Sequence, residues 1–136
     1  MADDGKTLAR SVHTALPHDS ARKHVSGEAL YTDDMPEPPG LLHAWILTSP
    51  RAHARIASID TSKAAGPGVF VMTAADIPGR NDVGPIHAGE PVLAEGIVEY
   101  VGQPVLAVAA SSIREAREAA QRAVVTYEDL PPVLSI

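Results

Sequence analysis

The sequence predicts an α+β domain, and two observations lead to this class. Short runs rich in strand-forming residues are spread along the 136 residues, whereas the strongest amphipathic helix pattern occurs once, at 113–123. Strands and helices also do not alternate in the regular order that a parallel sheet requires. We therefore expect an α+β fold with one long helix at about 113–123 and short helices elsewhere.

The predicted elements have recognisable boundaries. A short helix should begin at Asp19 or Ser20 and end at Gly27, and prolines in the segment 31–40 predict a loop. A helical turn should open at Asp60 or Thr61, and a long loop covers 78–91. Strands are predicted at 41–49, 51–56, 69–73, 92–94, 97–101, 104–110 and 124–127.

Two segments carry the spacing of a capping box, in which a hydroxyl side chain and an acidic residue three positions later bond to each other's backbone N–H. Thr73 precedes Asp76 in this way, and Ser112 precedes Glu115 at the start of the long helix. The apolar stripe of that helix predicts which side docks on the sheet. Its members are Ile113, Ala116, Ala119, Ala120 and Ala123.

Length and composition indicate a single domain. We expect a flexible terminus at 1–12 and one domain at 13–136. The formal net charge of −6 disfavours nucleic acid and anionic membranes as partners, and five aromatic residues are few for stacking on bases. Without cysteine there is no disulfide, thiolate metal site or iron–sulfur cluster. The polar N-terminal residues and the lack of a membrane-length apolar run predict a cytoplasmic protein.

The sequence offers no recognisable catalytic, cofactor-binding or metal-binding motif. No two of the six histidines are three or four residues apart, and Asp33 and Asp34 are adjacent, so they point to opposite faces of an extended chain. Glu128 and Asp129 are adjacent as well. Neither a complete phosphate-binding loop nor a dinucleotide-binding glycine pattern is present. We assign no catalytic, cofactor-binding or metal-binding residue.

Three basic residues alternate at the start of the second predicted strand. Arg51, His53 and Arg55 share one face there, while Ala52 and Ala54 share the other. In one interpretation, this face binds an anion or an acidic neighbouring surface. In the other, it is a solvated strand face whose basic side chains are paired with acidic residues of the same domain. The residues alone give the two interpretations equal weight.

Five segments in order resemble the α/β-hammerhead domain of the xanthine dehydrogenase and aldehyde oxidase family, closest to xanthine dehydrogenases, over about residues 10–136. They are His24-Val-Ser-Gly-Glu-Ala-Leu-Tyr-Thr-Asp-Asp-Met-Pro36, Ser49-Pro-Arg-Ala-His-Ala-Arg-Ile56, Pro67-Gly-Val69 with Thr73-Ala-Ala-Asp-Ile-Pro78, Tyr100-Val-Gly-Gln-Pro-Val105 and Val125-Thr-Tyr-Glu-Asp-Leu-Pro131. The resemblance implies a mixed, mostly antiparallel sheet.

The resemblance also implies a molybdenum hydroxylase, an oxidoreductase that inserts a water-derived oxygen into a purine or an aldehyde, as in purine catabolism. Its molybdenum–pterin cofactor lies in downstream domains of the same subunit, and iron–sulfur clusters and FAD lie in a partner subunit. The sequence has no Gly-Gly pair for a pterin loop, and Gln103 is not part of a pterin motif. We therefore expect a fragment without the catalytic domains and without a cofactor of its own.

Two classes of function remain open. The first is a structural domain that packs on the cofactor-binding domains and on the iron–sulfur and flavin subunit. Its candidate interface residues are Tyr31, Asp33, Arg51, His53, Tyr127 and Glu128, which combine aromatic anchors with charges that can be paired. The alternative is a free-standing module that binds a small ligand or a protein, with the loop 78–91 as a lid. A gene that ends after Ile136 would favour the module.

Overall fold

The structure is a computed structural model that describes residues 15–135. The contacts divide the chain into two compact units, one ending at Glu37 and one beginning at Pro38. The predicted flexible terminus at 1–12 lies outside the described residues. No helix among residues 15–135 is long and apolar enough to cross a membrane.

The unit that ends at Glu37 contains the predicted short helix. Helix α1 spans Ala21–Ser26, and Gly27 ends it with a φ of 77°, a left-handed conformation that glycine adopts without strain. The segment predicted as a proline-rich loop also contains one 3₁₀ turn, η1, at Thr32–Asp34. This turn forms because the Asp34 carboxylate accepts a hydrogen bond of 3.0 Å from the backbone N–H of Tyr31.

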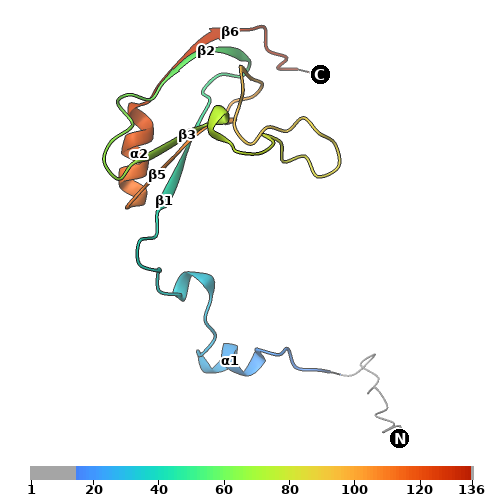
Figure 1. The fold of residues 1–136 in the computed structure, drawn as a ribbon. Helices are drawn as coiled ribbons and strands as arrows, with labels where there is room; N and C mark the ends of the chain where they lie inside the picture. The colour runs from blue at the N-terminus through green and yellow to red at the C-terminus, as the bar shows by residue number, and fades with distance from the viewer. Residues whose placement is uncertain (1–14, 136) are drawn as a thin grey trace, which may run out of the picture. The chain divides into compact units, whose positions relative to one another are not determined.

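The unit from Pro38 onward contains two three-stranded antiparallel sheets and one long helix (Figure 1). The strand order is β1-β5-β3 in the first sheet and β4-β2-β6 in the second. Their bounds are β1 His43–Thr48, β2 Ala54–Asp60, β3 Phe70–Thr73, β4 Ile97–Val98, β5 Pro104–Ala110 and β6 Val124–Asp129. Helix α2 spans Ile113–Arg122, and a 3₁₀ turn, η2, spans Ala74–Asp76. The α+β class and the antiparallel pairing are therefore confirmed.

Two apolar clusters form the core of this unit. In the first, Leu106 and Val108 of β5 pack against Ala119 and Ala120 of α2. In the second, Val105 packs with Ala54 and with residues around β4. Because adjacent side chains of a strand point to opposite faces, Val105 and Leu106 place β5 in both clusters.

Helix α2 docks through its alanines, as the stripe predicts. Ala116, Ala119 and Ala120 are fully buried, whereas Ile113 is 50% exposed, because it lies in the first turn, ahead of the part that packs on β5. The side chain of Ser112 accepts a hydrogen bond of 3.2 Å from the backbone N–H of Glu115.

The second hydrogen bond of that capping box, from the backbone N–H of Ser112 to the Glu115 carboxylate, does not form. The Glu115 carboxylate accepts a hydrogen bond of 2.6 Å from the Ser111 hydroxyl instead of bonding to the backbone of Ser112. The box at η2 is complete, since the Asp76 carboxylate accepts from the Thr73 backbone N–H at 2.8 Å.

The prediction of a strand at 92–94 is wrong. The side-chain amide of Asn81 donates to the carbonyl oxygen of Leu93 at 2.8 Å and accepts from its N–H at 3.1 Å. The Asn81 side chain thus takes up both backbone hydrogen-bonding groups of the buried Leu93, and residues 92–94 do not form a strand. Such a pairing across twelve residues has no local sequence signal.

Among the other predicted strands, two differ most in their bounds. The strand predicted at 97–101 stops at Val98, because the backbone N–H of Glu99 donates to the Gln103 side chain at 2.7 Å and a turn follows. The strand predicted at 51–56 begins at Ala54 and continues to Asp60. Before it, the Ser49 hydroxyl bonds to both the N–H and the carbonyl of Arg51, and the chain bends there.

Candidate functional site

The basic residues before and within β2 are paired with the neighbouring strand. Because β2 pairs antiparallel with β6, Arg51 lies 3.5 Å from the Asp129 carboxylate and Arg55 lies 3.8 Å from that of Glu128. Both pairs are more than half exposed, so each contributes only about 0–1 kcal/mol. Because both arginines are paired with carboxylates of the same domain, the structure favours a solvated strand face over an anion-binding site.

His53 and Tyr127 were expected to be exposed, but both are half-buried. The Nδ1 of His53 donates a hydrogen bond of 2.9 Å to the carbonyl oxygen of Pro131. Tyr127 packs against the core cluster that contains Ala54 and Val105. Burial raises the pKa of the Tyr127 phenol, and a hydrogen bond to Ser49 partly offsets this effect. Both side chains therefore contribute to the packing of the domain itself.

Tyr31 and Asp33 belong to the unit that ends at Glu37. Tyr31 is 61% exposed, and its hydroxyl lies 2.9 Å from Nδ1 of His24, within hydrogen-bond distance. Asp33 is exposed in η1. The structure thus brings together four of the six candidate interface residues, namely Arg51, His53, Tyr127 and Glu128, around the start of β2 and the end of β6.

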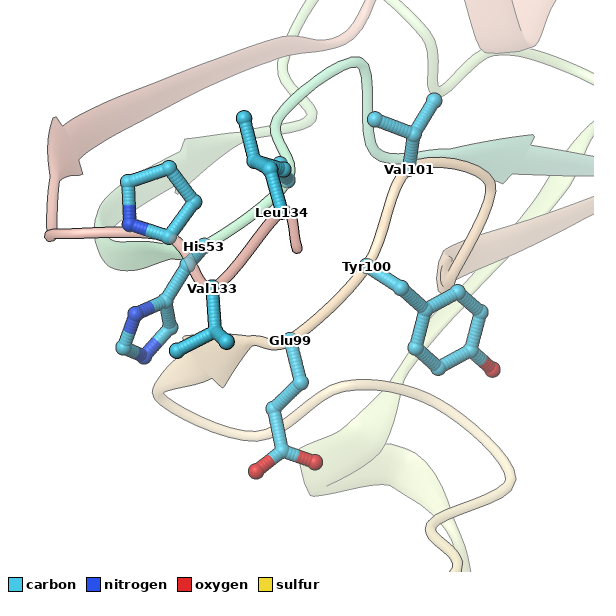
Figure 2. A pocket seen from close by; sticks show the side chains of 8 residues that line it. His53, Glu99, Tyr100, Val101, Val133 and Leu134 are labelled. Atoms are coloured by element: carbon cyan, nitrogen blue, oxygen red, sulfur yellow. The ribbon is translucent and has the colours of Figure 1, made fainter. Parts of the chain in front are cut away.

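A pocket of about 440 Å³ is lined by one of these four residues, His53 (Figure 2). Its wall is built from the turn before β2, the turn after β4 and the segment that follows β6. The lining residues are Ala52, His53, Glu99, Tyr100, Val101, Pro132, Val133 and Leu134. Its ionisable side chains are those of His53, Glu99 and Tyr100. The His53 ring already binds the carbonyl oxygen of Pro131. Sequence spacing did not predict this pocket because three distant segments form it.

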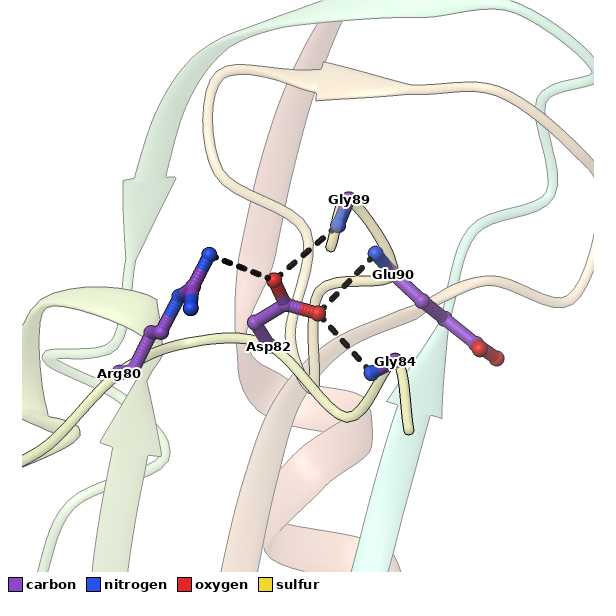
Figure 3. Close-up of polar contacts among 5 residues, drawn as sticks. All are labelled: Arg80, Asp82, Gly84, Gly89 and Glu90. Atoms are coloured by element: carbon purple, nitrogen blue, oxygen red, sulfur yellow. Dashed lines mark hydrogen bonds and ion pairs between the residues drawn. The ribbon is translucent and has the colours of Figure 1, made fainter. Parts of the chain in front are cut away.

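The long loop contains a polar centre that sequence spacing did not predict either (Figure 3). One carboxylate, that of Asp82, accepts hydrogen bonds from the backbone N–H groups of Gly84 at 2.9 Å, Gly89 at 3.0 Å and Glu90 at 3.3 Å. It also lies 3.3 Å from the guanidinium of Arg80. The hydrogen bond from the Gly84 N–H has the largest effect on the pKa of this carboxyl, and those from Gly89 and Glu90 act in the same direction. Together they hold the pKa below its ordinary value, although partial desolvation raises it.

Glycine is required at one position of this loop. A Cβ on Gly84 would collide with the backbone carbonyl of His87. Together with the bonds to Asp82, this close approach makes residues 82–90 a turn held by internal hydrogen bonds, and the lid of the alternative function stays a prediction.

The described residues do not fit a molybdenum–pterin group. Glycines with positive φ stand singly on separate turns and do not form one cradle of backbone donors. In the part of the chain that the structure describes, no three His, Cys, Asp or Glu side chains are placed to hold a metal ion. Within residues 15–135, the buried polar side chains Ser49 and Gln103 form hydrogen bonds in the turns around β2 and β4.

These features define the class as an α+β domain of two antiparallel sheets with one docked helix. The family described as the a/b hammerhead domain of aldehyde oxidase and xanthine dehydrogenase matches residues 26–131. The chain therefore belongs to this family, whose members are molybdenum hydroxylases.

Relatives and solved structures agree with this assignment. The chain is 47% identical to xanthine dehydrogenase 1 of Arabidopsis thaliana and 45% identical to aldehyde oxidase 4 of Mus musculus, over 93% and 88% of its length. It superimposes on quinoline 2-oxidoreductase from Pseudomonas putida 86 with a TM-score of 0.73 and 36% identity, covering 90% of this chain.

The chain spans only a small part of these proteins. It covers 9% of the xanthine dehydrogenase, 9% of the aldehyde oxidase and 17% of the quinoline 2-oxidoreductase chain. Activities of the whole relatives are therefore proposals for this chain.

Proposed function

We propose that this chain is a structural domain of a xanthine dehydrogenase-like molybdenum hydroxylase. In this role it packs on the cofactor-binding domains and on the part of the enzyme that carries iron–sulfur clusters and FAD. The observation that carries the proposal is the family match over 26–131, combined with coverage of about a tenth of each relative. The glycines with positive φ in the described residues stand on separate turns, which supports a packing role over a cofactor-binding one.

The substrate class is also a proposal. A purine such as hypoxanthine or xanthine is supported by the identity of 47% with xanthine dehydrogenase 1. Aldehyde oxidase 4 of Mus musculus, at 45% identity, supports an aldehyde as the second candidate. A cytoplasmic location and a role in purine catabolism are part of the same proposal.

A reconstitution experiment tests the structural role. The probe is Arabidopsis xanthine dehydrogenase 1 from which the segment matched by this chain has been deleted. When the 136-residue chain is expressed together with it, we expect the two to copurify and to recover molybdenum content and xanthine-dependent dye reduction. If the two neither copurify nor recover molybdenum, this chain does not perform the structural role.

A further inference from the structure

One face of the β1-β5-β3 sheet is apolar although no helix within the described unit from Pro38 onward covers it. The strand register places Ala44, Ala109 and Phe70 in one row across the sheet. The next row on the same face contains Ile46, Ala107 and Met72. We call these six residues the outer face. None of them is charged or carries a hydrogen-bonding side chain.

Helix α2 lies on the opposite face of this sheet, against Trp45, Leu47 and Leu106. The outer face is open to solvent in the unit from Pro38 onward. Phe70 is 61% exposed, Ile46 is 44% exposed and Met72 is 40% exposed. Antiparallel sheets that meet water on one side alternate apolar and polar residues, and β1, β5 and β3 do not follow this rule on their outer face.

The second sheet of the same unit is the internal comparison. Its exposed face mixes polar residues, namely Arg55 and Asp60 on β2 and Thr126 and Glu128 on β6, with the apolar Ile97 and Val124, as a solvated face allows. An exposed strand face without a charged or hydrogen-bonding side chain among six neighbouring residues is therefore specific to the β1-β5-β3 sheet in this comparison.

The outer face is continuous with the core. Val105 lies on the same side of β5 as Ala107 and Ala109, and it is fully buried where the second core cluster covers it. Farther along β5 the same face loses this cover, and the two alanines are half-buried. Small side chains on the central strand allow another surface to approach closely between Ile46 and Phe70.

We propose that the outer face is the surface through which this domain packs on the rest of the molybdenum hydroxylase subunit, an inference that rests on the proposed function. The chain covers 9% of the xanthine dehydrogenase it resembles, so most of such a subunit lies outside these residues. The occupant is an uncharged, apolar surface, because a charged group placed against these six residues would lose its hydration without gaining a partner.

The experiment uses the same segment-deleted xanthine dehydrogenase 1 and measures the Kd of its complex with the 136-residue chain. The variants Phe70→Glu and Ile46→Glu, tested separately, should each raise the Kd by roughly tenfold or more, since a buried charge at an interface core is costly. Val124→Glu is the matched control for Ile46→Glu. Val124 is 50% exposed on β6, in the other sheet, and its substitution should leave the Kd unchanged.

Each result distinguishes the two proposals. If the unmodified chain does not bind, the structural role is wrong, and the outer-face proposal falls with it. If it binds and both outer-face variants bind equally well, the structural role stands and the outer face is the wrong surface. If sedimentation finds that the unmodified chain is a dimer which Phe70→Glu dissociates, a second copy is the occupant and the proposal is overturned. Circular dichroism of each variant verifies that it is folded.

Discussion

Asp82 organises the long loop with a single carboxylate, because three backbone N–H groups and Arg80 converge on it. Its pKa is held below the ordinary value, so its stabilising effect is complete at pH values above the ordinary pKa of an aspartate. This effect is lost as the pH falls through the lowered value of the folded state. Asp82→Asn removes the charge at all pH values. We expect several-fold faster hydrogen exchange at the Gly84 and Gly89 amides, measured by NMR at neutral pH.

Glu90→Gln is the control for this substitution. Glu90 belongs to the same loop and donates its backbone N–H to Asp82, but its own side chain is exposed. Neutralising it should leave the exchange of both glycine amides unchanged. Equal acceleration in the two variants would mean that general loop charge, and not the Asp82 hydrogen bonds, orders the loop.

At the scale of single residues, the sequence predicts capping contacts better than loop contacts. Thr73 and Asp76 are three positions apart, a fixed spacing that the helical backbone requires, and their box is confirmed. Asp82 reaches amides two, seven and eight residues ahead, and Asn81 reaches Leu93. These separations depend on the path of an irregular loop, which no spacing rule encodes.

The start of α2 provides a prediction at the scale of an element. Ser112→Ala removes the acceptor for the Glu115 N–H and should lower the free energy of unfolding by about 1 kcal/mol. Ser111→Ala is the matched control, because the exposed Ser111 hydroxyl bonds only to the Glu115 side chain and its loss should change stability by less than about 0.5 kcal/mol. Thermal or urea denaturation measures both. If Ser111→Ala lowers the free energy of unfolding more than Ser112→Ala does, Ser112 is not the residue that caps the helix.

The docking of α2 provides a second prediction. Ala120 is fully buried against Leu106 and Val108, so the helix lies close to the sheet. Ala120→Leu should overpack this contact and lower the free energy of unfolding by roughly 1–3 kcal/mol. Gln121→Leu introduces the same side chain at an exposed position of the helix and should be nearly neutral. Equal stability of the two variants in urea denaturation would contradict this docking face.

Element boundaries follow the sequence where local patterns decide them. The limits of β5 and of α1 match the predicted segments because Pro104 begins β5 and Gly27, with its positive φ, ends α1. The start of β2 and the end of β4 differ from the predicted bounds. There, the Ser49 and Gln103 side chains form hydrogen bonds with backbone groups that would pair with a neighbouring strand if β2 and β4 were longer. Both side chains are buried, so their contacts depend on the tertiary fold.

For the whole molecule, the strand and helix patterns predicted the α+β class, and the order of family motifs predicted the mostly antiparallel sheet, whereas the candidate site was predicted only in part. Arg51 and Glu128 lie in the same region, but their charges are satisfied within the domain by Asp129 and Arg55. The outer face was not predicted because Ile46 and Phe70 become neighbours of one surface only through the strand order β1-β5-β3. Strand order is a property of long-range pairing, which periodicity does not encode.

The purified 136-residue chain should fold, bind no molybdenum and oxidise neither xanthine nor an aldehyde. A pterin cofactor needs several backbone donors converging on one group, and the glycines with positive φ in this chain stand on separate turns. The 440 Å³ pocket has His53, Glu99 and Tyr100 as its titratable groups, and the histidine ring is already bonded to a backbone carbonyl. Elemental analysis and a xanthine-dependent dye-reduction assay test this prediction, with intact Arabidopsis xanthine dehydrogenase 1 as the positive control. Stoichiometric molybdenum or turnover above buffer would place a cofactor site within these residues and would overturn the structural role.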